Sequence, residues 1–142
     1  FFKSVRSYPD VNERVEKLLA ELGMVSKKDL LSGTLSHGDQ RLLEIGLAMA
    51  SDPKLLFLDE PTAGMNPVER VKVLENIRRL SRENQSTFVI VEHDMDIVFS
   101  LSDRIIVLHR GQILADGKPE EIKQNEDVKK VYLGEEILWE KI

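Results

Sequence analysis

The chain has 142 residues and a net charge of −5, with 42% hydrophobic and 32% charged residues, which is ordinary for a globular domain. No basic cluster accompanies the negative charge, so composition argues against a nucleic-acid partner, because such binding relies on neutralised phosphates. There are no cysteines, which excludes disulfides and thiolate metal sites. No apolar run approaches the roughly 18 residues of a membrane-spanning helix, so any membrane role is expected to be peripheral.

The first helix is expected over residues 11–22. Asp10 followed by Glu13 matches a capping box, and apolar residues then recur at helical spacing. In the polar connection that follows, Leu30 and Leu31 are expected to anchor the chain on the core.

A second helix is expected to begin at Ser36. Ser36 can cap its first turn, and Asp39 can complete a capping box. Gly38 stays unexplained by capping, because glycine costs a helix up to about 1 kcal/mol. It makes sense if something must approach the backbone closely. A helix N-terminus with a serine hydroxyl and a bare glycine is an anion site, since its N–H groups and dipole favour phosphate.

The apolar run 55–58 organises the chain. It indicates a short strand buried on both faces, typical of a parallel sheet covered by helices. The strand ends on Asp59 and Glu60, at the carboxyl edge where open α/β sheets bind ligands. Two carboxylates at an apolar rim require a compensating cation, which magnesium with a nucleotide would supply. A solvated acidic turn is the alternative interpretation of this pattern alone.

A third helix is expected to start at Asn66 and Pro67, with Asn66 as its cap. Its expected buried stripe consists of Val68, Val71, Leu74, Ile77 and Leu80. A second apolar strand at 87–91 then leads to His93. Strands joined by a crossover helix lie parallel, with a right-handed connection. We therefore expect His93 and Glu60 at the same edge of the sheet.

Short elements are expected after His93. They are a helix over 95–101, a hairpin of strands 104–108 and 112–115, and short helices over 119–124 and 127–132. Trp139, in an acidic tail, is expected to pack against the domain's own surface, with a partner contact as the alternative.

Taken together, three motifs in this order resemble the ATP-binding cassette (ABC) ATPases. Residues 35–40 are similar to the signature motif, 59–67 to Walker B with its D-loop, and His93 to the switch histidine. The resemblance runs from about residue 11 to residue 134. The stretches that look like the ATPase subunits of branched-chain amino acid importers are 35–38, 43–46, 61–67 and 128–134. The ATPase subunits of urea importers and lipopolysaccharide exporters have similar C-terminal ends.

The resemblance implies an α/β fold of the P-loop NTPase type, with a mostly parallel sheet, flanking helices, a C-terminal β-hairpin and short helices. Nothing in the chain matches the phosphate loop G-x-x-x-x-G-K-[ST]. The chain also opens on Phe1 rather than Met, so we expect the C-terminal part of a nucleotide-binding domain whose phosphate-loop strand is missing. Its expected parts are a helical signature region (1–52), a core with Walker B, D-loop, switch histidine and hairpin (53–118), and C-terminal helices with a tail (119–142).

The resemblance also implies residue roles, with ATP and Mg²⁺ as cofactors. Two such domains pack head to tail. The residues that would contact ATP bound mainly to the partner domain are Ser36, His37, Gly38 and Gln40, with Asn66 in the D-loop. Asp59 would hold Mg²⁺ through water, Glu60 would be the general base, and His93 would hydrogen-bond the γ-phosphate.

Three positions depart from the commonest family pattern. His37 replaces a glycine, Asp39 stands where glutamine is usual, and Asn66 replaces an aspartate. A carboxylate beside a phosphate should weaken an anion site unless that carboxylate is spent on capping.

The implied function is that of an ATP-hydrolysing transporter subunit importing branched-chain amino acids or a related small polar solute. It would lie peripherally at the cytoplasmic face of the membrane, with a second nucleotide-binding domain and permease subunits as partners. One alternative is another ABC ATPase, of lipopolysaccharide export or DNA maintenance. A further alternative is that the 142 residues alone form an inactive folded binding module.

Overall fold

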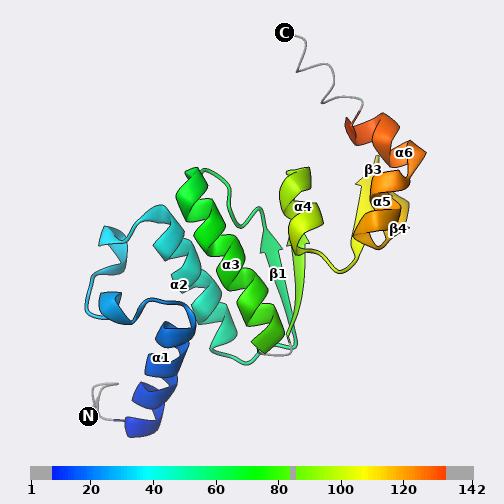
Figure 1. Ribbon diagram of the computed structural model, residues 1–142. Coiled ribbons are helices and arrows are strands. Elements are labelled where there is room, and N and C mark those ends of the chain that lie inside the picture. The colour runs from blue at the N-terminus through cyan, green and yellow to red at the C-terminus, as the bar shows by residue number, and fades with distance from the viewer. Residues whose placement is uncertain (1–7, 84–85, 134–142) are drawn as a thin grey trace. The chain divides into compact units, whose positions relative to one another are not determined.

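The computed structural model describes residues 8–83 and 86–133 (Figure 1). Contacts divide the chain into two compact units, Phe1–Glu92 and His93–Ile142. The expected subdivision into residues 1–52, 53–118 and 119–142 stays a prediction. Trp139 lies outside the described residues.

The first unit places helices against a parallel sheet, as expected. Its helices are α1 (Pro9–Glu21), α2 (His37–Met49) and α3 (Pro67–Glu83), with short turns η2 (Val25–Lys27) and η3 (Ser32–Thr34) before α2. Its strands are β1 (Leu55–Asp59) and β2 (Thr87–Val91). The strands are paired in parallel, with Asp59 opposite Val91, and α3 connects them. The carboxyl ends of both strands therefore meet at one edge, which confirms that part of the prediction.

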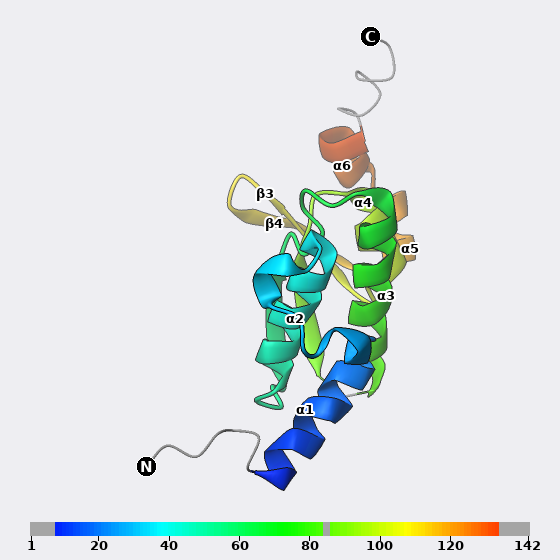
Figure 2. The ribbon, with the colours of Figure 1, turned by 90° about the vertical axis from the view of Figure 1, so that its left-hand side faces the viewer.

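The core of this unit lies between α2, α3 and one face of the sheet, and the two helices run side by side in both ribbon views (Figures 1 and 2). Its buried members are Leu22, Met24, Leu42, Ile45, Met49, Leu58, Val73, Ile77 and Leu80. Burying one such side chain contributes about 1.5–3 kcal/mol. Gly46 permits the contact with the end of α1, because a Cβ there would collide with Leu22.

The other sheet face is exposed in the described residues. Leu55 is 50% exposed, Phe57 66% and Val91 58%. The prediction that β1 is buried on both faces is therefore wrong, because α2 and α3 pack only on the side that carries Leu56 and Leu58.

Two expectations about the start of the chain are also wrong. Helix α1 begins at Pro9 behind Tyr8, without a side-chain cap, so the Asp10–Glu13 capping box does not form. Leu30 and Leu31 are 56% and 78% exposed. Met24, 2% exposed, fills the core in their place.

The buried stripe of α3 is shifted from the predicted one. Val68 and Val71 are 81% and 54% exposed, whereas Val73 is fully buried. Val73, Ile77 and Leu80 follow the 3.6-residue period of a helix and face the core together. The prediction was therefore wrong for Val68 and Val71 at the N-terminal end of the helix and right for Ile77 and Leu80.

The second unit contains helix α4 (Met95–Leu101), strands β3 (Ile105–His109) and β4 (Gln112–Gly117), and the short elements α5 (Pro119–Gln124), α6 (Glu126–Val128) and η4 (Lys129–Leu133). The strands pair antiparallel, which confirms the predicted hairpin. Arg110 and Gly111 make its turn with φ values of 49° and 78°, the backbone that a two-residue type I′ turn requires. The last predicted helix is present as α6 followed by the wider turn η4.

Within the described ranges, no helix combines the length and apolar character needed to cross a membrane.

Candidate functional site

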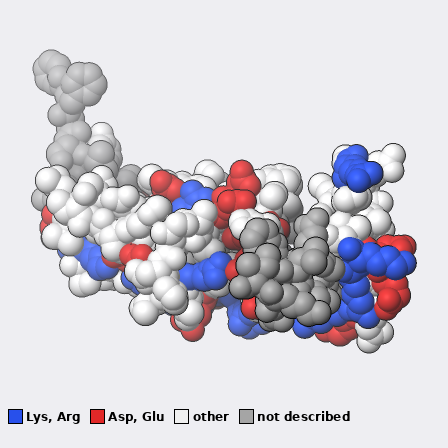
Figure 3. All heavy atoms as spheres, turned by 90° about the horizontal axis from the view of Figure 1, so that it is seen from above, with Lys and Arg blue, Asp and Glu red and all other residues white. Residues whose placement is uncertain are grey.

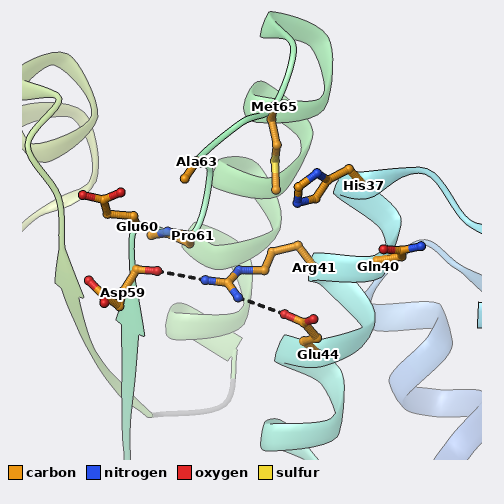
Figure 4. A pocket seen from close by; sticks show the side chains of 9 residues that line it. All are labelled: His37, Gln40, Arg41, Glu44, Asp59, Glu60, Pro61, Ala63 and Met65. Atoms are coloured by element: carbon orange, nitrogen blue, oxygen red, sulfur yellow. Dashed lines mark hydrogen bonds and ion pairs between the residues drawn. The ribbon is translucent and has the colours of Figure 1, made fainter. Parts of the chain in front are cut away.

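A pocket of about 540 Å³ opens between the start of α2 and the carboxyl end of β1 (Figure 4). Its lining residues are His37, Gln40, Arg41, Glu44, Asp59, Glu60, Pro61, Ala63 and Met65. Four of the predicted site residues, two from the signature motif and two from the acid pair, therefore lie around one pocket. The other lining residues of the pocket were not predicted from sequence.

The acid pair stands at the rim of this pocket. Asp59 and Glu60 are both exposed, and in Figure 4 their carboxylates point away from Arg41 and His37. The backbone of Asp59 is joined to α2 through a 2.9 Å hydrogen bond from the Arg41 guanidinium to its carbonyl oxygen. The acids are thus presented outward, while the backbone of Asp59 is anchored to α2.

A second bond ties this edge to the end of β2. The hydroxyl of Thr62, which is 3% exposed, donates to the carboxylate of Glu92 at 3.3 Å. His93 follows Glu92 in sequence but begins the second unit. Its approach to Glu60 stays a prediction.

The first turn of α2 is capped by Ser36 as predicted, but the predicted capping box does not form, because the Asp39 carboxylate accepts from the Ser36 hydroxyl and not from its backbone N–H. The amide of Asp39 donates to Oγ of Ser36 at 3.3 Å, and the Ser36 hydroxyl donates to the Asp39 carboxylate at 3.1 Å. The side-chain amide of Gln40 donates to the carbonyl oxygens of Ser32 at 3.3 Å and Leu35 at 3.2 Å. In this structure the hydroxyl of Ser36 and the amide of Gln40 hold the turn itself.

Asp39 is the most buried acid of the site, with 4% exposure. Lys27 from η2 and Lys72 from α3 both donate to its carboxylate, Lys72 at 2.6 Å. Burial alone would raise the pKa of Asp39. Hydrogen bonds from Lys27, Lys72 and Ser36 outweigh that effect and lower the pKa from 3.8 to about 2. The charge that should weaken an anion site is therefore neutralised within the chain.

No local sequence pattern predicted this cluster of Asp39 with two lysines. Lys27 and Lys72 lie 12 and 33 residues from Asp39, and Lys72 had the spacing of an exposed helix face. A lysine that bonds to a distant carboxylate has no local pattern, so only the fold reveals the pair.

Gly38 does admit a close approach, and the group that approaches belongs to the chain. A Cβ at Gly38 would lie 3.0 Å from Cβ of Glu69. The amide of Gly38 points at the Glu69 carboxylate at 3.4 Å, a favourable place for an anion at a helix N-terminus. Asn66 donates to the same carboxylate at 2.8 Å. Glu69 thus joins Asn66, at the start of α3, to Gly38 in the first turn of α2.

Asn66 also caps α3, as predicted, because its Oδ1 accepts hydrogen bonds from the amides of Val68 and Glu69 at 3.0 Å each. His37 lies beside the D-loop, where its Cε1 would be 3.9 Å from a Cβ on Gly64. Gly64 has a φ of 72°, a left-handed conformation that glycine adopts without strain.

Among the described residues, no three His, Asp or Glu side chains gather so as to hold a metal ion unaided. Mg²⁺ does not require such a cage. It is commonly bound by one or two carboxylates together with phosphate oxygens and water. The outward-facing Asp59 carboxylate fits that manner of binding.

Comparison with known proteins identifies the family of the chain. The profile of the family described as ABC transporter matches residues 2–63, and that of the branched-chain amino acid ATP-binding cassette transporter matches residues 112–137. The high-affinity branched-chain amino acid transport ATP-binding protein BraF of Pseudomonas aeruginosa is 43% identical over 92% of this chain and 51% of its own length. LivG of Escherichia coli, with the same description, is 40% identical over the same shares. The chain spans about half the length of these curated relatives.

Solved structures give the same result. MJ1267, an ATP-binding cassette of an ABC transporter in its ADP conformation, superimposes with a TM-score of 0.79 and 31% identity over 94% of this chain and 54% of that chain. The protein cbiO1 of Clostridium perfringens, part of the ABC transporter complex cbiONQ, gives a TM-score of 0.76 and 30% identity over 93% and 52%. With its matching profiles, relatives and fold, the chain belongs to the ABC transporter ATP-binding proteins and is similar to their branched-chain amino acid subfamily.

Proposed function

We propose that this chain is part of the ATP-hydrolysing subunit of an importer for branched-chain amino acids or a related small polar solute. The observation that carries the proposal is the single pocket that joins an outward-facing acid pair at the end of β1 to a serine-capped helix start. The names of BraF and LivG support the choice of substrate class.

ATP with Mg²⁺ supplies the phosphoryl group and the cation that compensates the acids. Asp59 would hold the cation through water. Glu60 accepts the proton of the attacking water and orients it, and His93 donates a hydrogen bond to the γ-phosphate. Positioning and charge stabilisation of this kind are what phosphoryl transfer requires. An effective general base contributes about 10²–10⁴ in rate.

The signature turn acts on a nucleotide held mainly by a second nucleotide-binding domain. Ser36, His37, Gly38 and Gln40 are its contacts, and Asn66 contributes from the D-loop. In this structure the donors of Ser36 and Gly38 point at the carboxylates of Asp39 and Glu69. When ATP held by the second domain binds here, its phosphate replaces the carboxylates of Asp39 and Glu69 as the acceptor of these hydrogen bonds. The assembly lies at the cytoplasmic face of the membrane, against permease subunits.

We expect no nucleic-acid partner. On the face that Figure 3 presents, Lys and Arg residues are interspersed with Asp and Glu over the described part of the chain. Nucleic-acid binding needs a continuous basic surface. DNA-stimulated ATP hydrolysis would instead favour an ABC ATPase of DNA maintenance.

The first test of the proposal is to read the coding sequence upstream of Phe1. We expect an in-frame phosphate loop there. Protein that includes it should hydrolyse ATP in the presence of Mg²⁺, whereas the 142 residues alone should not. Upstream sequence with no phosphate loop, or turnover by the 142 residues after removal of contaminating ATPases, would contradict the proposal.

A further inference from the structure

The peptide unit between Asp59 and Glu60 is fixed at both ends. Its carbonyl oxygen, on Asp59, accepts a 2.9 Å hydrogen bond from Nη2 of Arg41. Its N–H, on Glu60, donates at 2.9 Å to the carbonyl oxygen of Val91 at the end of β2. A peptide unit is planar, so holding both of its polar ends sets the torsions on either side of it.

One of those torsions is unusual. Glu60 has a φ of 40°, in the left-handed region where a Cβ is disfavoured. Residues other than glycine persist there only when their surroundings over-determine the backbone, and such residues concentrate at functional sites. The Glu60 carbonyl is held as well, by the amide of Ala63 at 3.1 Å. The conformation of Glu60 is therefore imposed by its neighbours.

Arg41 is itself held in place. Its Nη1 donates to the carboxylate of Glu44, one turn further along α2, at 2.8 Å. The arginine side chain is 29% exposed. A planar guanidinium can serve two acceptors in fixed directions, which a lysine ammonium on a flexible stem cannot reproduce. Figure 4 shows the resulting line from Glu44 through Arg41 to the backbone of Asp59.

We propose that Arg41 is a positioning residue that sets the orientation of Glu60 and ties it to the first turns of α2. The role of Glu60 as a base rests on the proposed function, but the mechanical link does not. Because Arg41 is attached to the helix that carries the signature turn, a shift of that helix pulls on the peptide unit before Glu60. A movement of residues 35–40 at the start of α2 therefore changes the orientation of Asp59 and Glu60 in the same chain.

The test is hydrogen exchange of single backbone amides in the 142-residue chain, with Arg41→Met as the variant. A hydrogen bond from a charged donor contributes enough that its loss should speed exchange of the Glu60 amide about tenfold. Core amides such as those of Ile45 and Ile77 should stay within about twofold of their wild-type rates, since one hydrogen bond at the rim is lost and the core is untouched.

The chain offers a matched control. Arg14 also joins a helix to a backbone carbonyl and a carboxylate, donating to Ala50 at 3.2 Å and to Asp52 at 3.1 Å. Asp52 also has a left-handed φ, of 49°. Arg14→Met should leave exchange at Glu60 within about twofold of wild type. Equal acceleration at Glu60 by both variants would mean general loosening and would overturn the proposal, as would an unchanged Glu60 amide in Arg41→Met.

Two milder variants cover the case in which Arg41→Met does not fold. Arg41→Lys and Glu44→Gln each weaken the contacts from Glu44 through Arg41 to the Asp59 carbonyl without removing them. Each should speed exchange of the Glu60 amide about threefold. Unchanged exchange in both variants would also overturn the proposal. In phosphate-loop-containing protein, Arg41→Met should lower kcat about tenfold with KM for ATP within about twofold. An inactive wild-type protein would refute the proposed function, while the exchange result would still decide the role of Arg41.

Discussion

Two acidic regions of the first unit have opposite environments. Asp39, in the first turn of α2, is buried and receives hydrogen bonds from two lysines and a serine. Asp59 and Glu60, at the end of β1, are exposed with their carboxylates turned outward. Within the described residues, the Asp59 carboxylate makes no ion pair or hydrogen bond. The same residue type thus serves internal structure in one region and is available to a ligand in the other.

The difference shows that the position of an acid in a motif does not determine its role. Asp39 lies inside the segment that resembles the signature motif, yet its charge is neutralised by ion pairs with Lys27 from η2 and Lys72 from α3. The acid pair is held by its backbone instead, through Arg41 and Val91. Anchoring by the backbone leaves the carboxylate of Asp59 available to bind a cation.

The largest effect on stability is expected at Asp39. Asp39→Asn should lower the free energy of unfolding by about 3 kcal/mol, because it leaves two lysines without their partly buried counter-charge. The measurement is urea unfolding of the 142-residue chain. Asp52→Asn is the control: its ion pair with Arg14 is exposed, and such pairs contribute about 0–1 kcal/mol. Similar losses in the two variants would erase the contrast between buried and exposed acids.

A smaller effect should appear with pH. Asp39 has a pKa of about 2 when folded and 3.8 as its reference value, so the folded chain binds fewer protons in this range. Its contribution of about 2 kcal/mol should be complete above pH 4 and fade as pH falls through 2. Unfolding of wild type and Asp39→Asn should be compared from pH 6 to pH 2. The difference between the two should shrink on acidification. A constant difference would rule out titration of Asp39.

The smallest effect is expected at Glu60. Glu60→Gly should raise the free energy of unfolding by up to about 1 kcal/mol, since glycine tolerates the left-handed backbone and loses some of that gain through its greater freedom when unfolded. Thermal or urea unfolding measures the change. Asp52→Gly should gain less, because aspartate accepts a left-handed φ more readily than glutamate. A clear loss of stability in Glu60→Gly would show that the side chain, rather than the backbone, is what the fold requires.

The elements with strong local patterns could be predicted from sequence. The apolar runs of β1 and β2, the caps at Ser36 and Asn66, and the hairpin of β3 and β4 were all expected and are present. The family followed from three motifs in order. Local patterns sufficed because each depends on residues only a few positions apart.

Features that depend on distant contacts could not be predicted. Which face of α3 is buried, why Leu31 is exposed while Met24 is core, and which face of β1 stays open all depend on how the helices meet the sheet. The partners of Asp39, Gly38 and the Asp59 carbonyl come from other elements. Glycine at 38 matched the family motif, but its neighbour Glu69 is visible only in three dimensions.

The most direct test of the account is ATP turnover by Glu60→Gln in protein that contains the phosphate loop. We expect Mg²⁺–ATP to bind as in wild type and hydrolysis to fall by about 10²–10⁴, the contribution of a general base. Turnover at the wild-type rate, with the substituted residue confirmed, would remove Glu60 from the chemistry and with it the distinction between the two acidic regions.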